Sequence, residues 1–189
     1  LSLVGYFISA VKNNKTKLAK WILMALFFSW VGDVLLMFQE KKPDLFLFGL
    51  VSFLIAHIFY IIFFNRIRVR EKIKPHLFFL LIVGIYYAAL IIRLSPFLDA
   101  MKWPVRVYGF VISIMLMLAL HMLFSRNKKA AKWMVLGAVL FVISDSVLAI
   151  NKFYQSFEVA DIIIMLSYGL AQLFIVYGAV RYVDSANSN

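Results

Sequence analysis

The chain has 189 residues, of which 64% are hydrophobic, and its mean hydropathy of +0.91 excludes an ordinary soluble domain, whose apolar content is about 45–50%. The formal net charge of +11 comes from lysines and arginines in short loops without interleaved aromatic residues, which argues against nucleic acid as a partner. Cysteine is absent, so disulfides and thiolate metal sites are excluded.

Apolar blocks of about 20 residues, the length that crosses a bilayer, divide the chain into seven predicted helical segments. The first is too short to span a membrane, and the sequence opens on Leu1 rather than Met, so we expect that the N-terminus is missing. The sequence predicts an all-α, polytopic transmembrane helix bundle that forms a single domain over residues 1–189. Its segments are 1–11, 21–38, 45–64, 76–92, 104–124, 133–150 and 159–182.

Basic residues are distributed unevenly between the two ends of these segments. Fourteen lie in the loops around 12–20, 66–74 and 126–132 or, as Arg181, in the tail. Six lie at the opposite end: Lys41, Lys42, Arg93, Lys102, Arg106 and Lys152. Cytoplasmic loops carry the excess of Lys and Arg, so we predict an integral, multi-pass protein with a cytoplasmic C-terminus.

An internal repeat is visible when the chain is shifted by 112 residues. The shift aligns NKTKLAKW at 14–21 with RNKKAAKW at 126–133, and without a gap it also pairs Asp33 with Asp145. Both copies run in the same direction, which predicts a parallel repeat about an axis along the membrane normal. The same shift predicts a further helix upstream of Leu1, and therefore eight helices arranged as four plus four, with halves of roughly 1–74 and 75–189.

Asp33 and Asp145 are the acidic residues that fall within the predicted spans, whereas the other seven lie in loops, at span ends or in the tail. Each lies 13 residues after the lysine of a Lys-Trp pair, so both carboxylates are about 20 Å from the cytoplasmic edge. A charged side chain at the bilayer centre costs roughly 3 kcal/mol or more, so an acid in this position is a candidate for function. The alternative is a structural pair bonded to hydroxyl or basic groups.

Other polar side chains within the spans extend the candidate site. His57 is a proton shuttle, a partner for an aspartate or a buried core histidine, and with a small insertion the repeat pairs it with Gln172. Tyr60 lies one turn from His57, and Tyr168 one turn from Gln172. Their hydroxyl groups orient a substrate or pack in the core, and the same alternatives hold for Tyr108.

The residues that flank Asp145 complete the set. No G-x-S-x-G motif accompanies Ser144 and Ser146, so we interpret them as groups that orient Asp145 and not as nucleophiles. Basic or polar residues near the non-cytoplasmic end could meet a lipid phosphate or simply extend to the interface: Lys152, Asn151, Arg93 and Arg106. No pair of closely spaced His and acidic residues supports a metal site, and we expect neither a metal nor another cofactor.

Four stretches carry a resemblance to a known family. They are FFSWVGDVLLMF at 27–38, FLIAHIFYI at 53–61, PVRVYGFVISIML at 104–116 and LFVISDSVLAINKF at 140–153. Together they resemble the lysoplasmalogenase family, the YhhN-like membrane proteins, over nearly the whole chain. The resemblance implies an eight-helix fold, a lysophospholipid substrate among membrane lipids, catalytic roles for Asp33 and Asp145, and a site role for His57. A Lys-Pro pair typical of the second helix of the family is not seen here and would lie before Leu1.

Characterised members of that family hydrolyse the vinyl ether bond of lysoplasmalogens to a fatty aldehyde and a glycerophospho-ethanolamine or -choline. This reaction begins with protonation of carbon, and two carboxyl groups in a low-dielectric site share protons in a coupled way. We hypothesise that Asp145 is the acid and that Asp33 stabilises the cation and activates water, with His57 as a relay. The main alternative is a proton-coupled transporter of a small molecule or lipid that uses the same aspartates.

Overall fold

The computed structural model of the chain describes residues 2–11 and 18–187, which are helices joined by short connections. The seven α-helices are α1 (Ser2–Val11), α2 (Ala19–Met37), α3 (Asp44–Arg70), α4 (Leu77–Leu94), α5 (Lys102–His121), α6 (Lys128–Ala149) and α7 (Ala160–Asn187). Short 3-10 turns follow α4 and α5, and a π-helical turn over Ile150–Tyr154 continues α6. The predicted all-α bundle, with a first segment too short to span, is confirmed.

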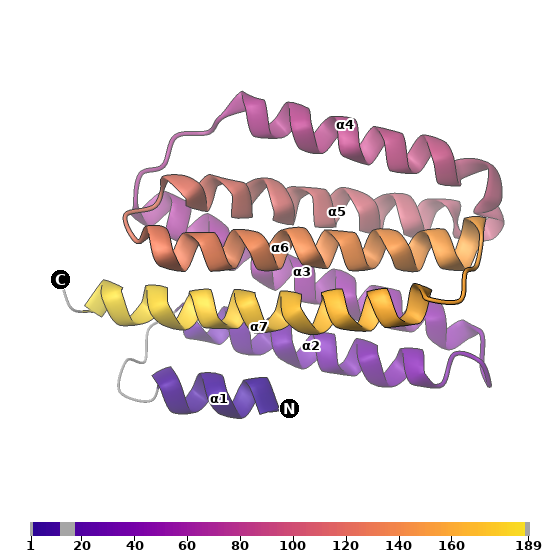
Figure 1. Cartoon of the computed structure of the whole chain (residues 1–189), viewed down its shortest axis with the longest axis horizontal. Helices are drawn as coiled ribbons and strands as arrows, with labels where there is room; N and C mark the ends of the chain where they lie inside the picture. The colour runs from indigo at the N-terminus through magenta and orange to yellow at the C-terminus, as the bar shows by residue number, and fades with distance from the viewer. Residues whose placement is uncertain (1, 12–17, 188–189) are drawn as a thin grey trace.

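The helices lie side by side with their long axes roughly aligned (Figure 1). The closest pairs are α2 with α3 and α6 with α7, and α5 packs against α3, α4 and α6. The short helix α1 packs against α7 and α2 on the opposite side of the bundle from α4. This arrangement leaves α3, α5, α6 and α7 around the interior.

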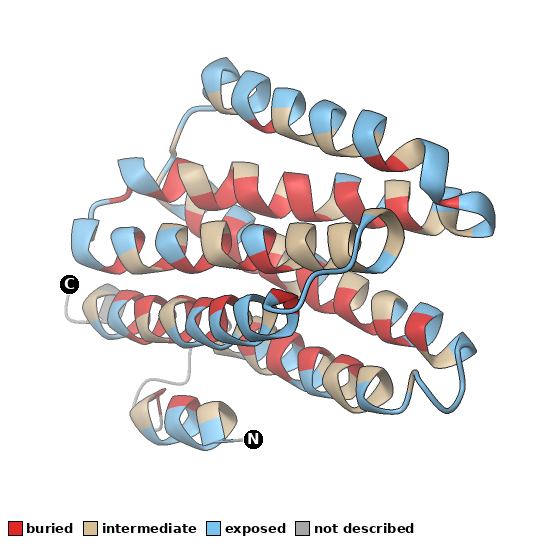
Figure 2. Cartoon of the chain, turned by 45° about the vertical axis from the view of Figure 1, so that its right-hand side comes forward, coloured by how far each residue is buried: buried red, intermediate tan, exposed pale blue. Residues whose placement is uncertain are grey.

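Six helical segments are long and apolar enough to cross a membrane, and α1 is the shorter apolar helix. The protein is therefore an integral, multi-pass membrane protein. Buried residues face the interior between α3, α5, α6 and α7, whereas α4 is exposed along most of its length (Figure 2). The exposed apolar side chains of α4 match the apolar surroundings of a bilayer.

The end of α3 differs from the sequence prediction. Helix α3 continues to Arg70, so Arg66, Arg68 and Arg70 lie on its last turns and not in the following loop. Arginine favours helix, and its long side chain extends toward the interface from a helical position, so the positive charge does not end the helix. Residues Lys12, Lys15 and Lys17 of the first basic loop lie outside the described residues.

Glycines allow close approach within both tight helix pairs. A Cβ at Gly137 of α6 would lie 2.7 Å from the carbonyl oxygen of Ala171 on α7. A Cβ at Gly178 of α7 would lie 2.8 Å from the carbonyl oxygen of Ala130 on α6. The ring of Phe53 on α3 covers Gly32 of α2, so a Cβ at Gly32 would lie 2.7 Å from this ring. These contacts fix how the helices that carry the aspartates are rotated against their neighbours.

The contacts of α5 and α1 can be compared across the predicted repeat, which stays a prediction. Helix α5 packs against α6 of its own half and α3 of the other, and α1 likewise packs against α2 and α7. The division at about residue 74 stays a prediction, and the helix expected upstream of Leu1 lies outside the described residues.

Candidate active site

Asp145 lies at the meeting point of three helices. It is on α6, and the hydroxyl group of Tyr108 on α5 donates a hydrogen bond to its Oδ2. The Nε2 of His57 on α3 lies 3.8 Å from the same oxygen. His57 is fully buried, whereas 14% of the Asp145 side chain is exposed, so the carboxyl group is held from the interior and is still reachable from outside.

Hydrogen bonding determines which nitrogen of His57 faces Asp145. The Nδ1 of His57 lies 2.7 Å from the carbonyl oxygen of Phe53, one turn earlier on α3. A carbonyl oxygen only accepts, so Nδ1 carries a proton and donates it. The buried Nε2 has no hydrogen-bond partner in the part of the chain that the structure describes, and it points at Asp145. Nε2 and the carboxylate are both acceptors unless one of them is protonated, so a proton on either group would remove the unfavourable pairing of two acceptors.

Asp33 belongs to a second hydrogen-bond network. The hydroxyl group of Tyr168 on α7 donates to Asp33 Oδ2 at 3.1 Å. The Nε2 of Gln172 donates to the hydroxyl groups of Tyr168, at 3.3 Å, and Ser29, at 2.9 Å. Tyr60 on α3 donates to Gln172 Oε1 at 2.5 Å. Each polar group therefore has a partner, and the chain of bonds joins α2, α3 and α7.

The ring of Phe141 lies between the two networks. Its centroid is 4.7 Å from that of His57 and 5.4 Å from that of Tyr168, with edge-to-face geometry in both contacts. Asp33 and Asp145 are thus bonded to different partners. Within residues 2–11 and 18–187, no group of three or more His, Asp or Glu side chains is placed to hold a metal ion.

One partner of each aspartate comes from the other half of the predicted repeat, whereas Tyr108, which donates to Asp145, belongs to the same half as Asp145. His57 belongs to the first half and approaches Asp145 of the second. In the second half, Tyr168 donates a hydrogen bond to Asp33 of the first half, and Gln172 donates one to Tyr168. His57 and Gln172 are the pair that the repeat aligns, so they occupy corresponding places near the two carboxyl groups.

The expectation that the flanking serines orient Asp145 is wrong. The hydroxyl group of Ser144 donates to the carbonyl oxygen of Ile164 on α7 at 3.0 Å. Ser146 bonds a carbonyl group of its own helix and the hydroxyl group of Tyr86, both at 2.5 Å. In an apolar helix a serine hydroxyl group readily donates a hydrogen bond to the carbonyl group one turn earlier. A position next to Asp145 in the sequence therefore does not bring the serine hydroxyl groups to its carboxyl group. The orienting hydroxyl group comes from Tyr108.

A cavity of about 210 Å³ borders Asp33. Its walls come from α1, α2 and α7, and they combine apolar side chains with the polar groups of the Asp33 network. A Cβ built at Gly169 would have no atom within 4 Å, so the wall is open there. The lining residues are Ser2, Leu3, Val4, Leu26, Ser29, Trp30, Asp33, Tyr168, Gly169 and Gln172.

The basic side chains at the end of α4 and the start of α5 interact locally. Arg93 donates to the hydroxyl group of Tyr154 and lies over its ring. Arg106 donates to the hydroxyl group of Ser95 at 3.2 Å and lies over the ring of Trp103. Their role toward a lipid phosphate stays a prediction.

The two polar residues of the π-helical turn also have partners. The Nζ of Lys152 donates to Gln39 Oε1 at 3.3 Å and lies over the ring of Phe46, and Asn151 Oδ1 accepts from the backbone N–H of Phe157 at 3.2 Å. Lys152 thereby bridges the ends of α6 and α2, so it stands over the end of the bundle nearer Asp145.

Sequence reasoning missed three residues of this site: Ser29, Tyr86 and Phe141. Ser29 lies four residues before Asp33 and Phe141 four residues before Asp145, on the same helix face as each acid. The repeat therefore contained a signal for both, because the shift of 112 residues also aligns them. Tyr86 had no comparable signal, since its contact with Ser146 depends on how α4 lies against α6.

Half-buried carboxyl groups with tyrosine donors and a histidine, carried on apolar spans, define a polytopic membrane protein with a polar site inside the bundle. The chain belongs to the YhhN family, whose sequence profile matches residues 1–179.

Named relatives are lysoplasmalogenases. The chain is 34% identical to lysoplasmalogenase TMEM86B of Mus musculus over 164 residues, which is 85% of this chain and 64% of the relative. It is 30% identical to the lysoplasmalogenase of Mycobacterium tuberculosis over 173 residues, which is 90% of this chain and 64% of the relative. The chain spans just under two thirds of the length of these relatives. No solved structure matches it.

Proposed function

We propose that the protein hydrolyses the vinyl ether bond of lysoplasmalogens, with Asp33 and Asp145 as the acid–base residues. The products are a fatty aldehyde and a glycerophospho-ethanolamine or -choline. The observation that carries this proposal is the buried Nε2 of His57, which has no hydrogen-bond partner among residues 2–11 and 18–187 and faces Asp145 at 3.8 Å. The names of the relatives support the same reaction class.

In the first step a proton passes from Asp145 to the outer carbon of the vinyl ether, and the double bond becomes an oxocarbenium ion. The proton held between His57 and Asp145 is the one transferred. Tyr108 keeps the carboxyl group oriented through its hydrogen bond. A carboxylate near the developing cation stabilises it, as it does in glycoside hydrolysis.

In the second step water adds to the cationic carbon, and Asp33 accepts a proton of that water to give the hemiacetal. As the bond between this carbon and the glycerol oxygen breaks, Asp33 gives its proton to the leaving glycerol oxygen, and Asp145 takes the proton of the hemiacetal hydroxyl group, which leaves the aldehyde. Tyr168 donates to Asp33 Oδ2, which leaves the other carboxylate oxygen for the water. Return of a proton to the His57–Asp145 pair completes the cycle, and the net change is the consumption of one water.

The substrate lies with its alkenyl chain against the apolar walls of the cavity beside Asp33. The excess of basic residues in one set of loops supports a cytoplasmic C-terminus, and with that orientation the carboxyl groups are nearer the opposite face. Lys152 is seven residues beyond Asp145, about 10 Å along the helix, which suits a phosphate separated from the vinyl ether by one glycerol unit. The headgroup therefore approaches from the non-cytoplasmic side.

Helix geometry favours the hydrolase over the proton-coupled transporter. Transporter sites are commonly built where spans are interrupted near the midplane. Here α2 is a regular helix over Ala19–Met37 and α6 over Lys128–Ala149, through the depth of both aspartates. The π-helical turn comes five residues after Asp145, at the end of the span.

The test uses the purified chain in detergent with an alkenyl lysophosphatidylethanolamine. Released fatty aldehyde is measured for the parent protein and for Asp33→Asn and Asp145→Asn. Each substitution keeps the shape of the side chain and removes its acid–base function, so we expect a fall in kcat of about 100-fold or more. Asp161→Asn, at an exposed position in the first turn of α7, is the matched control and should keep full activity.

Full aldehyde release by both folded aspartate variants would exclude these roles. Proton-coupled uptake into vesicles by the parent protein, without aldehyde release, would favour the transporter.

A further inference from the structure

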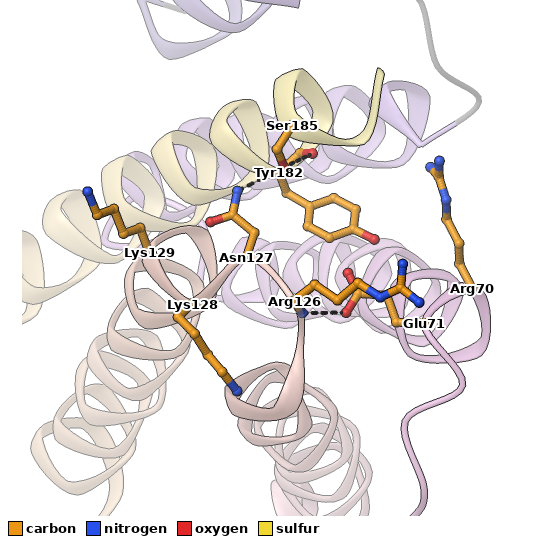
Figure 3. Close-up of a pocket in the computed structure, with 8 residues that line it drawn as sticks. All are labelled: Arg70, Glu71, Arg126, Asn127, Lys128, Lys129, Tyr182 and Ser185. Carbon is orange, nitrogen blue, oxygen red and sulfur yellow. Dashed lines mark hydrogen bonds between the residues drawn. The ribbon is translucent and has the colours of Figure 1, made fainter. Parts of the chain in front are cut away.

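A second cavity lies at the end of the bundle opposite Lys152, where α3 ends, α6 begins and α7 ends (Figure 3). Its volume is about 500 Å³, more than twice that of the cavity beside Asp33. Its walls are mostly polar side chains carried by three helices that are distant in sequence. They are Arg70, Glu71, Arg126, Asn127, Lys128, Lys129, Tyr182 and Ser185.

The charge of this basic cavity is unbalanced. Four of its side chains are cationic and one, Glu71, is acidic. The Glu71 carboxylate already accepts from the backbone N–H of Arg126 at 2.8 Å and hydrogen-bonds the side chain of Tyr182. Glu71 thus links the α5–α6 connection to the end of α3. Its carboxylate oxygens already accept hydrogen bonds from within the protein.

The other polar residues of the walls fix the shape of the cavity. Asn127 caps α6 by accepting from the backbone N–H of Ala130 at 3.0 Å, and its Nδ2 donates to the hydroxyl group of Ser185 at 2.8 Å. These bonds join the start of α6 to the last turns of α7. Arg126 and Lys129, by contrast, are exposed and project from this fixed frame.

The distance from the aspartates separates this cavity from the proposed hydrolysis. Lys129 is 16 residues before Asp145 on the same helix, about 24 Å at the rise of an α-helix. One glycerol unit between phosphate and vinyl ether cannot bridge that length. A phosphate held in the basic cavity therefore belongs to a molecule other than the lipid under attack.

We propose that the basic cavity binds a phosphate group, either on the headgroup of an anionic lipid or on a soluble phosphate. Arginine and lysine are the side chains that recognise phosphate oxygens, and arginine does so with paired hydrogen bonds. The positive end of the α6 dipole adds to the same field. The volume exceeds what one ion needs, so the cavity also accommodates the group that bears the phosphate.

Thermal unfolding of the purified chain in nanodiscs tests the proposal. One series uses phosphatidylcholine nanodiscs with increasing inorganic phosphate at constant ionic strength, and another uses mixed phosphatidylcholine–phosphatidic acid nanodiscs. We expect the unfolding temperature to rise in at least one series. Stabilisation by phosphatidic acid alone identifies a lipid ligand, and stabilisation by inorganic phosphate identifies a soluble one.

The double variant Arg126→Gln/Lys129→Gln removes two exposed charges and leaves the backbone contact of Arg126 with Glu71 in place. Removal of these two charges should weaken phosphate binding about tenfold. Lys41→Gln/Lys42→Gln removes the same charge from exposed positions at the other end of the bundle and should respond like the parent. Glu71→Gln keeps an oxygen that accepts from Arg126 and removes the one negative charge, so phosphate should bind more tightly.

Stabilisation in neither series would overturn the proposal. An equal shift in the Arg126/Lys129 and Lys41/Lys42 variants would also overturn it, because the effect would then follow net charge and not this cavity. Aldehyde release is not used as a readout, so the outcome is independent of the proposed hydrolysis.

Discussion

The Nε2 of His57 lies 3.8 Å from Asp145 Oδ2, and the other ring nitrogen is held by the carbonyl oxygen of Phe53 at 2.7 Å. This geometry fixes the tautomer and leaves one lone pair directed at a carboxyl group inside the bundle. Buried histidines usually bond both nitrogens, so an Nε2 that has no partner within the described residues favours a role for His57 beyond packing. The predictions below begin from that contact.

His57→Gln should lower kcat for vinyl ether hydrolysis by about 100-fold or more, because glutamine hydrogen-bonds but does not hold a transferable proton. Glutamine is also the residue that the repeat places in the corresponding position, at Gln172, so the change is tolerated sterically. Aldehyde release under saturating substrate is the measurement.

His121→Gln is the matched control for that variant. His121 is also buried, its Nδ1 also lies 2.7 Å from a carbonyl oxygen one turn earlier, and its Nε2 accepts from the backbone of His76 at 3.0 Å. It is at the far end of α5 from Tyr108, so its variant should keep its kcat. Equal losses in the two variants would mean that buried histidines only support the fold.

Tyr108→Phe should reduce kcat by roughly 10- to 100-fold, the equivalent of one hydrogen bond to a charged group. The hydroxyl group of Tyr108 orients Asp145, and its loss leaves the carboxyl group free to rotate. The apolar contacts of the ring are kept, so KM should change little. A rise in KM with unchanged kcat would show that Tyr108 contacts substrate and does not position the acid.

Much of this architecture could be predicted from the sequence. Apolar length predicted the six spans. The 112-residue shift predicts one depth for Asp33 and Asp145, because helical rise converts sequence distance into height. The position of a residue along the axis of its own helix depends only on the sequence, so it can be predicted without knowing which helices pack beside it.

Rotation of each helix could not be predicted in the same way. In a membrane both the lipid-facing and the buried sides are apolar, so hydrophobic periodicity does not reveal which side faces inward. For that reason the partner of Asp145 was expected among its neighbours Ser144 and Ser146, whereas it comes from Tyr108 on another helix. The position of Phe141 between the two networks depends on the same rotation.

Gly169→Leu should impair use of the substrate by filling the cavity beside Asp33. The position faces open space on α7, so the new side chain enters the cavity without displacing the protein core. We expect kcat/KM to fall by about tenfold or more, mainly through KM, since the loss is one of ground-state binding.

Gly84→Leu controls for the addition of an apolar side chain. Gly84 is on the exposed helix α4, and a Cβ there also has no atom within 4 Å. Its variant should keep the parent kcat/KM. If Gly169→Leu also keeps it, the alkenyl chain lies elsewhere in the bundle.

Gly137→Ala should destabilise the protein, because the added methyl group would lie 2.7 Å from the carbonyl oxygen of Ala171 and 2.7 Å from Ile175. Backbone atoms do not move aside, so α6 and α7 must separate, at a cost of about 1–3 kcal/mol in the free energy of unfolding.

Gly84→Ala adds the same methyl group in open space, and alanine favours helix by about 1 kcal/mol over glycine, so its unfolding temperature should hold or rise. Thermal unfolding in detergent compares the two variants. Equal unfolding temperatures would mean that α6 and α7 pack less closely than their glycines indicate. Aldehyde release by Gly137→Ala should fall as well, since separation of α6 from α7 moves Tyr168 away from Phe141 and shifts the Asp33 network against the Asp145 network.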